Sequence, residues 1–227
     1  MATIISNLDL IRRVPLFSLI PQAQAQIMAV AVIKKRFKRG ENLVEQGENS
    51  GALFIILSGR ARVVLTSDLG REVILARLGQ GDCIGEMSLI DGEAHSATVS
   101  AETQVDALML GRQAFSQCLG ASSLLAEAVM RALVQRLRNA DRKIESLALL
   151  DVYGRVARAL IEMADRDSQG QLRITEKISR QDIAKSIGAS REMVSRVMKE
   201  FAERDYLEES SDGSIQIHDH LMAKGQW

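Results

Sequence analysis

A regular apolar repeat occupies the middle of the chain, between residues 124 and 150. Its apolar positions alternate at spacings of four and three residues, the a/d pattern of a two-stranded coiled coil. These positions are Ala126, Met130, Leu133, Leu137, Ala140, Ile144 and Leu147. The stretch lacks proline and glycine, so it predicts one helix about 40 Å long at about 1.5 Å of rise per residue. Packing on its own domain is the alternative, but a repeat of three heptads favours a dimer helix.

The segment before this helix has the pattern of a β protein. From Phe37 onward, glycines separate short runs of β-branched or alternating apolar residues. These runs are residues 53–57, 61–66, 72–78, 96–101 and 106–110. Short strands at this spacing predict a barrel or a sandwich, and residues 67–70 form a predicted hairpin turn with Gly70 at a positive φ. Short helices are expected at residues 4–19, 21–32 and 113–119, the second opening at Pro21.

After the long helix the apolar pattern becomes helical again. We expect a helix over residues 152–165, a break at 167–170, two further short helices, and a last pair of strands at 207–209 and 214–217. Asp212-Gly213 forms the predicted turn between those strands. Two helices followed by a β-hairpin predict a winged helix-turn-helix.

Composition narrows the class of protein. The chain of 227 residues is 46% hydrophobic, which is typical of a globular protein, and it has no apolar run of 18 residues and no secretory signal. We therefore expect a cytoplasmic protein without a membrane partner. Cys83 and Cys118 are isolated, which argues against a disulfide framework, a metal site or an iron–sulfur sensor.

Net charge is zero over the whole chain, with 29 basic and 29 acidic residues, but the charge is unevenly distributed. Residues 171–204 contain eight Lys or Arg against five Asp or Glu, a net of +3. A local basic excess in a helical segment is typical of a surface that binds nucleic acid.

The spacing between residues 180 and 199 fits a helix-turn-helix closely. Gly188 lies in the predicted turn, and Ala184 falls four residues before it, where two helices must approach closely. The other inward positions are apolar: Ile183, Ile187, Ala189, Val194 and Val197. Ser179 and Ser190 are predicted to cap the first and second helices through their hydroxyls.

The second helix exposes side chains suited to reading bases. The planar fork of Arg matches guanine O6 and N7, and Glu accepts from cytosine N4, so we expect base contacts from Arg191, Glu192 and Arg196. Solvation of a helix end is the alternative for these charges, but a unit whose inward positions all fit favours base reading. Phosphate contacts are expected from Ser179, Arg180, Ser190 and Lys199, and the predicted DNA-binding set also contains Gln181 and Ser195.

Four sequence strings now point to a known family. Residues 81–89 read GDCIGEMSL, 150–156 read LDVYGRV, 178–183 read ISRQDI, and 190–196 read SREMVSR. They resemble motifs of the cyclic-AMP receptor protein and FNR family of bacterial transcription regulators. The first string resembles the family's phosphate-binding cassette and the second its hinge, and the last two resemble its DNA-reading helix-turn-helix. The resemblance extends over nearly the full chain.

The resemblance implies an α+β fold with three parts. Residues 1–123 would form an effector-binding β-roll of the cyclic-nucleotide-binding (jelly roll) type, residues 124–151 the dimerisation helix and hinge, and residues 152–227 the winged helix-turn-helix. It implies a homodimer on palindromic double-stranded DNA with TGTGA-like half-sites, and RNA polymerase as a further partner. The implied ligand-binding residues are Gly85, Glu86, Met87, Ser88, His95, Ser96, Ala97, Arg136 and Asp141.

The predicted pocket departs from the family pattern at two places. Members that bind cyclic AMP carry Arg-Ser where this chain has His95-Ser96, and Thr-Ser where it has Ala140-Asp141. A neutral His has one donor and no fixed charge, so it replaces the phosphate-pairing Arg poorly. Cyclic AMP and another cyclic nucleotide such as cyclic di-GMP both stay open as effectors, and Arg136, Arg138 and Arg142 could serve the latter or be a solvated helix face. Haem bound through His95 is a weaker alternative.

The resulting expectation is a DNA-binding regulator that is not an enzyme, with no catalytic residues, no metal ligands and no covalent cofactor. A ligand-independent regulator of the same family is the alternative. A cyclic-nucleotide-gated scaffold or enzyme module is less favoured, because the last third contains the bihelical spacing and no pairing of nucleophile and base.

Overall fold

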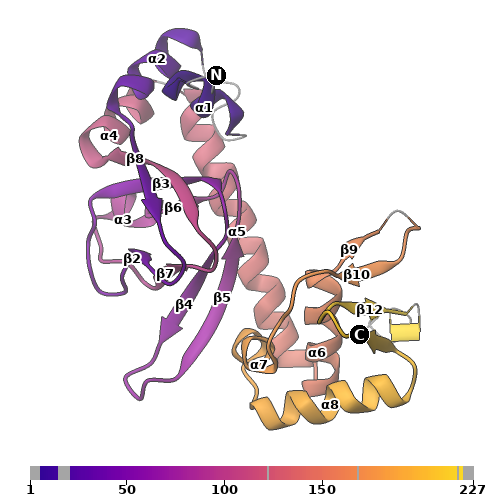
Figure 1. The fold of residues 1–227 in the computed structure, drawn as a ribbon. Coiled ribbons are helices and arrows are strands. Elements are labelled where there is room, and N and C mark those ends of the chain that lie inside the picture. Colours follow the sequence, from indigo (N-terminus) through magenta and orange to yellow (C-terminus); the bar gives the residue numbers. More distant parts are fainter. Residues whose placement is uncertain (1–5, 15–20, 122, 168, 219, 222–227) are drawn as a thin grey trace. The chain divides into compact units, whose positions relative to one another are not determined.

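The computed structural model describes the chain except for residues 1–5, 15–20, 122, 168, 219 and 222–227 (Figure 1). The chain divides into two compact units, Met1–Leu137 and Arg138–Trp227. The helix α5, Ser123–Leu149, contributes residues to both. The predicted domain bounds at residues 123/124 and 151/152 therefore stay a prediction.

The first unit contains two four-stranded sheets whose strands pair in the antiparallel sense. One sheet has the order β1-β8-β3-β6 and the other β2-β7-β4-β5. The strands are β1 Ile33–Phe37, β2 Asn42–Val44, β3 Ala52–Ser58, β4 Ala61–Thr66, β5 Glu72–Leu78, β6 Cys83–Ile84, β7 Thr98–Ala101 and β8 Val105–Gly111. This arrangement is the two-sheet β-roll that the sequence predicts.

Strand β3 shows why this unit has two cores. Phe54 and Ile56 lie in a cluster formed with residues of both sheets, whereas Leu53 and Ile55 pack in a second cluster with the helices. Successive side chains of a strand point to opposite faces, so β3 is buried at five consecutive positions because both its faces are covered. The helices of this unit are α1 Asn7–Arg13, α2 Gln22–Ala31, α3 Glu86–Asp91 and α4 Arg112–Ala121, together with the start of α5.

The predicted strands were found, but three others were missed. Residues 61–66 and 72–78 are β4 and β5 with the predicted bounds, whereas β1, β2 and β6 were not expected. β1 is exposed at four of its five positions, and β6 has two residues, so neither has an apolar alternation to detect. The helix expected over residues 4–19 ends at Arg13, and residues 15–19 lie outside the described part of the chain.

Helix α5 presents two different faces. Leu125 and Val129 are buried in the helix-covered core of the first unit. In contrast, four positions of the predicted seam are 50–64% exposed: Met130, Leu137, Ile144 and Leu147. The single chain therefore leaves most of the predicted apolar stripe uncovered, although Leu133 packs against the core of the first unit.

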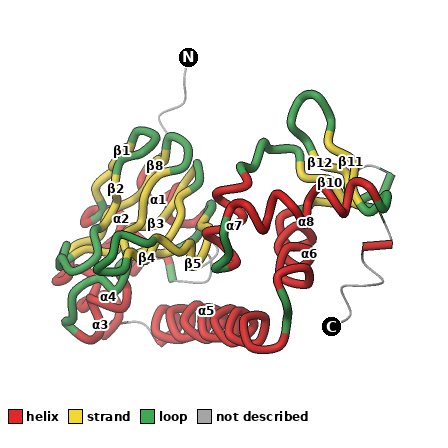
Figure 2. The backbone as a smooth tube through the Cα atoms, turned by 90° about the horizontal axis from the view of Figure 1, so that it is seen from below, coloured by secondary structure: helices red, strands yellow, loops and turns green. Residues whose placement is uncertain are grey.

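The second unit is a helical core with a small sheet, visible in Figure 2 as α6, α7 and α8 beside the strands β10, β11 and β12. The helices are α6 Val152–Met163, α7 Arg180–Ile187 and α8 Arg191–Glu203. The sheet has the order β11-β12-β10-β9, with β9 Asp165–Arg166, β10 Leu172–Ile174, β11 Leu207–Glu209 and β12 Ile215–Ile217. Its core contains Leu160, Ile183, Val194, Val197 and Phe201, each at most 4% exposed.

Two expectations for this unit were wrong in detail. The helix expected to reach Asp165 ends at Met163, because the chain turns there into β9. The strands β9 and β10 were not expected; β10 has three residues, and its assignment depends on pairing with β12 across more than 40 residues of sequence. The winged helix-turn-helix itself is confirmed, with a wing sheet that has two strands more than predicted.

Among the described residues no single helix is long and apolar enough to cross a membrane. Residues 112–120 and α5 together reach the length and hydropathy of a membrane-spanning segment, but the two helices are bent by 110° relative to each other.

Candidate functional site

Glycine is required where the cassette turns from β6 into α3. Gly85 has φ +89°, in the left-handed region that favours glycine. A Cβ atom added there would lie 2.5 Å from the carbonyl oxygen of Ala52, which is closer than real contacts allow. The turn therefore brings the backbone of the cassette against β3 and directs Glu86, the first residue of α3, into the interior.

Glu86 is a buried carboxylate with one oxygen paired and one unpaired. Its side chain is joined through Oε1 to Arg136 of α5, which also donates to the carbonyl oxygen of Cys83 at 3.0 Å. Oε2 is buried and has no hydrogen-bond partner within the described part of the chain. Burial raises the pKa of Glu86, and the charge of Arg136 opposes that shift. Oε2 is thus an acceptor that a ligand hydroxyl or amine could satisfy.

Cys83 lies beside this pair as a protonated thiol. Burial, with smaller contributions from the carboxylates of Glu86 and Asp82, raises the pKa of Cys83 to about 12. A thiol with this pKa is neither a nucleophile nor a metal ligand near neutral pH. Its carbonyl oxygen, which accepts from Arg136, is the part of the residue that contributes to the site.

His95 is held between two serine hydroxyls inside the protein. Its Nδ1 lies 3.0 Å from Oγ of Ser88, and its Nε2 lies 2.9 Å from Oγ of Ser50. The backbone N–H of Ser50 also donates to Nε2 at 3.3 Å. Because Nε2 accepts that bond, the ring hydrogen is assigned to Nδ1, which then donates to Ser88.

Burial disfavours the charged form of the His95 ring. The residue is 7% exposed, and burial lowers its pKa, with a smaller opposing contribution from Glu48. Its backbone is tied as well, since the N–H of His95 donates to Glu48 and its carbonyl accepts from Gly47, both at 2.8 Å. His95 therefore links the loop before β3 to α3, and it presents no fixed positive charge to an anionic ligand.

The structure brings only part of the predicted ligand set together. Gly85, Glu86 and Arg136 meet, and the sulphur of Met87 lies 3.9 Å from Nη1 of Arg136. Ser96 is exposed, Ala97 is buried, and Asp141 is an exposed residue of α5 that belongs to the second unit. Ser50 and Cys83 were not predicted as part of the site. No pattern in consecutive residues could identify Ser50, which is 45 positions from His95.

The helix-turn-helix has the geometry that its sequence predicts. Oγ of Ser179 accepts from the N–H of Asp182 at 3.0 Å, and Oγ of Ser190 accepts from the N–H of Met193 at 3.2 Å, so both predicted caps are confirmed. Gly188 has φ +65°, which closes α7 in the left-handed region. Arg155 of α6, which was not predicted, donates to the carbonyl oxygen of Ile187 at 2.9 Å and fixes the turn.

The outward face of α8 is polar and mostly basic. Arg191, Glu192, Ser195, Arg196 and Lys199 are exposed, as a DNA-reading surface requires. Hydrogen bonds from its own backbone and from the Ser190 side chain lower the pKa of Glu192, so its carboxylate is charged and turned toward the start of the helix.

Two predicted phosphate contacts already have partners within the second unit. Arg180 forms an ion pair with Glu209 of the wing strand β11. Lys199 lies 3.6 Å from Glu203 one helical turn away, and both side chains are more than 60% exposed, so this pair is easily exchanged for a phosphate. Gln181 is exposed at the start of α7.

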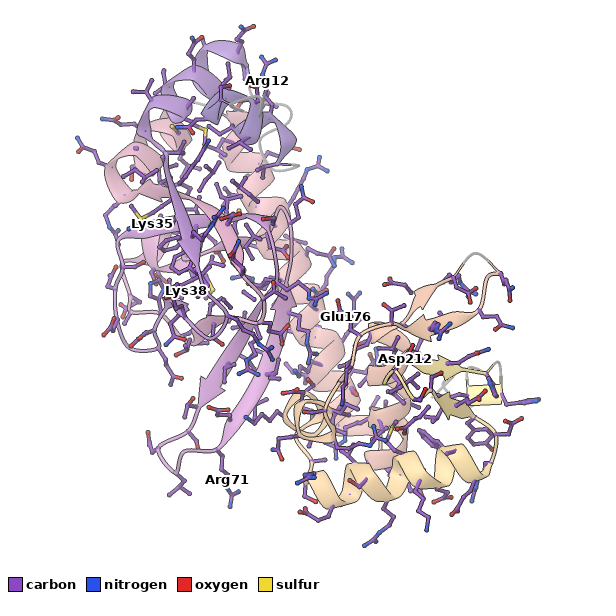
Figure 3. All side chains as sticks on the ribbon, in the orientation of Figure 1. Arg12, Lys35, Lys38, Arg71, Glu176 and Asp212 are labelled. Carbon is purple, nitrogen blue, oxygen red and sulfur yellow. The ribbon has the colours of Figure 1, made fainter. Side chains whose placement is uncertain are left out.

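The charged residues labelled in Figure 3 belong to other segments of the two units. Arg71 lies at the connection between β4 and β5, and Lys35 and Lys38 lie on or beside β1. Glu176 and Asp212 belong to the second unit, next to the strands of the wing sheet. The described residues include no group of three His, Cys, Asp or Glu side chains that could hold a metal ion.

Comparison with protein families gives two matches along the chain. Residues 34–122 match the cyclic nucleotide-binding domain, and residues 154–221 match the Crp-like helix-turn-helix domain. The first match contains the cassette, Glu86 and His95, and the second contains the capped helices α7 and α8.

Relatives of known function share this organisation. The chain is 32% identical over 187 residues to the CRP-like cAMP-activated global transcriptional regulator of Mycobacterium tuberculosis, covering 79% of this chain and 84% of the relative. It is also 32% identical over 169 residues to the cAMP-activated global transcriptional regulator CRP of Salmonella typhimurium, covering 72% and 80%.

A solved structure has the same fold at lower identity. The c-di-GMP responsive global regulator CLP of Xanthomonas campestris superposes with a TM-score of 0.73 at 24% identity, covering 87% of this chain and 99% of that one. The two family matches, the identity to the relatives and the shared fold together show that this chain belongs to the CRP family of transcription regulators, which join a cyclic nucleotide-binding domain to a DNA-binding helix-turn-helix domain.

Proposed function

We propose that this protein is a homodimeric, non-enzymatic regulator whose affinity for DNA is controlled by a cyclic nucleotide bound beside α5. One observation carries the proposal: Glu86 of the cassette is joined to Arg136 of α5, while its second oxygen is buried and unpaired. A ligand hydroxyl that donates to this oxygen would contact the same carboxylate that holds α5. Binding would thereby favour one arrangement of that helix over another.

Two cyclic nucleotides fit the chemistry of the site. Both cyclic AMP and cyclic di-GMP carry phosphate and hydroxyl or amine donors, and the relatives named above respond to one or the other. The neutral His95 cannot supply the charge that pairs with a phosphate, so an anion would depend on backbone N–H groups at the Gly85 turn. The absence of a charged partner for the phosphate at His95 favours a ligand that is also recognised through its hydroxyl or amine groups.

The dimer would form through α5. Its exposed stripe of Met130, Leu137, Ile144 and Leu147 is apolar and follows heptad spacing, so a second copy of the same helix covers it. A two-fold dimer would place its two α8 helices in successive major grooves about 34 Å apart, on a palindrome of TGTGA-like half-sites. We also expect RNA polymerase to be a partner of the dimer. The protein is expected to act in the cytoplasm.

The test is isothermal titration of the purified protein with cyclic AMP, cyclic GMP and cyclic di-GMP, repeated with His95→Arg. Micromolar binding of cyclic AMP by the unmodified protein would support a cyclic-AMP regulator in which His95 is tolerated. Binding of cyclic di-GMP alone, or of cyclic AMP only by His95→Arg, would indicate a pocket altered for another signal.

A ligand-independent regulator is the second candidate. It is favoured by the hydrogen bonds of Ser88 and His95, which are satisfied within the protein. Absence of heat with all three nucleotides, together with full affinity for DNA in their absence, would support this candidate and contradict effector control.

A further inference from the structure

Met193 is an exception in the second unit. In the described part of the chain after α5, it is the one large apolar side chain that is exposed, at 44%. The other large apolar residues of α8, Val194, Val197, Met198 and Phe201, are at most 4% exposed. A single exposed apolar residue is ordinary on a protein surface, so the position of Met193 on α8 decides what it could contact.

The position of Met193 is set by the helix cap. Its backbone N–H donates to Oγ of Ser190 at 3.2 Å, so it is the third residue of α8 in a fixed first turn. Arg196 follows three residues later, and residues three apart lie on the same side of a helix. Met193 therefore lies beside Arg196, at the edge of the outward surface of α8.

The charges around Met193 identify the kind of partner. Arg191, Arg196 and Lys199 are exposed on the same helix, and Arg196 forms no ion pair with any described residue. An apolar side chain beside a cation with no described ion-pair partner is poorly suited to an apolar protein surface, whereas it suits the major groove of DNA, where phosphates flank the base edges.

The major groove offers one prominent apolar group, the 5-methyl of thymine. Arg and Glu recognise the hydrogen-bonding edges of guanine and cytosine, but neither reads that methyl group. The flexible thioether of Met can adapt to the position of a base in the groove. We infer that Met193 is a specificity-determining residue that contacts a thymine 5-methyl group in each half-site. This inference rests on the proposed function, since it requires α8 to enter the major groove.

The test begins with selection of a duplex from a random library by the full-length protein, in separate pools with cyclic AMP, with cyclic di-GMP and without nucleotide. Each thymine of the selected site is then replaced by deoxyuridine, which lacks only the methyl group. We expect wild-type affinity to fall about fourfold at one thymine per half-site, the effect of one buried methyl group.

Two variants assign that effect to Met193. In Met193→Ser the same replacement should change affinity less than about twofold, the margin within which independent sites add, because no apolar contact remains to be lost. Met193→Leu is the control, since it keeps an apolar side chain and should keep most of the discrimination. Both variants should retain the wild-type slope of affinity against salt, since the number of charged contacts is unchanged.

The outcomes separate this inference from the proposed function. Specific binding with no sensitivity to deoxyuridine, or with equal sensitivity in the wild type and Met193→Ser, would overturn the role of Met193 and leave sequence-specific binding intact. Failure to select any sequence in all three pools would overturn both. Matching thermal unfolding curves for the wild type and the variants establish that the fold is not the cause.

Discussion

His95 lies between two serine hydroxyls, and this environment determines its charge. Bonds to Ser50 and Ser88 satisfy both ring nitrogens, and burial lowers the pKa of the imidazole. From the sequence alone, His95 could be a solvent-facing cation or a neutral side chain that connects two buried segments. Its contacts with the two serines favour the neutral, connecting side chain.

The first prediction concerns the pH dependence of stability. The folded-state pKa of His95 is lowered from the ordinary value of 6.5, so the unfolded state binds the proton more readily. The stability that the neutral ring contributes is present above pH 6.5 and is lost as the pH falls through the lowered folded-state pKa. His95→Gln keeps hydrogen-bonding groups without this titration, at a cost of about 1 kcal/mol at pH 7.

We expect the thermal midpoint of the wild type to fall more steeply than that of His95→Gln between about pH 6.5 and pH 5. Calorimetric scans of both proteins at half-unit intervals measure the difference. Parallel curves would mean that other groups cause the acid sensitivity and that the His95 ring is not held neutral.

The second prediction separates base contacts from phosphate contacts on α8. Arg191→Ala should relax base preference at one position of each half-site, at a cost of about 1–3 kcal/mol for the preferred base. Lys199→Ala should weaken binding about equally on all sequences and reduce the salt slope by about one. Binding of single-base variants of the selected site, measured at several salt concentrations, checks both; equal losses on every sequence would refute the division.

At the scale of elements, α5 has one face that packs in the first unit and another that is largely exposed. Its buried face, with Leu125 and Val129, belongs to the core of the first unit, whereas most of its heptad positions are exposed. Apolar residues on more than one face explain why the helix can pack on its own domain and still leave a stripe for a second copy. Packing on the first unit accounts for one face of the helix, and the dimer stays a prediction for the other.

The third prediction tests that stripe. Leu137→Glu introduces a carboxylate at a seam position that is 62% exposed in the single chain, so a dimer would bury two like charges. We expect the dissociation constant of the dimer to rise on the order of a hundredfold or more, the equivalent of a few kcal/mol. Leu149→Glu is the matched control, because Leu149 is 77% exposed and lies outside the heptad positions.

Sedimentation velocity over a range of micromolar concentrations distinguishes the two variants. A wild-type monomer at micromolar concentration, or equal dissociation in both variants, would contradict the proposed dimer helix.

At the scale of the whole molecule, the contact between Glu86 and Arg136 is where an effector signal would enter α5. Arg136 also donates to the carbonyl oxygen of Cys83, so it connects α5 to both sides of the Gly85 turn. Allosteric control requires that a ligand bind two states with different affinity, and a residue shared by the pocket and the helix can provide that difference.

The fourth prediction therefore concerns coupling. Arg136→Ala should weaken nucleotide binding at least about tenfold, the effect of losing one charged hydrogen bond, and should abolish the effect of nucleotide on DNA affinity. Arg131→Ala is the control on the same helix, since Arg131 pairs with Glu127 on an exposed surface. Titration calorimetry and DNA binding with and without nucleotide measure the two effects; wild-type coupling in Arg136→Ala would exclude this route.

The sequence by itself determined the features that depend on neighbouring residues. The heptad repeat located α5 to within one residue at each end, alternation located β4 and β5, and the spacing around Gly188 located both capped helices. These elements are long enough to show a period, or they contain residues such as Gly and Ser whose local conformation is specific.

The tertiary structure alone decided the contacts between distant segments. Glu86 meets Arg136 across 50 positions, His95 meets Ser50 across 45, and β10 pairs with β12 across more than 40. None of these approaches leaves a periodic signal, because they depend on how sheets and helices pack. That packing also decides which side chains are buried. It lowers the pKa of His95, leaves Oε2 of Glu86 buried without a hydrogen-bond partner among the described residues, and leaves Met193 exposed.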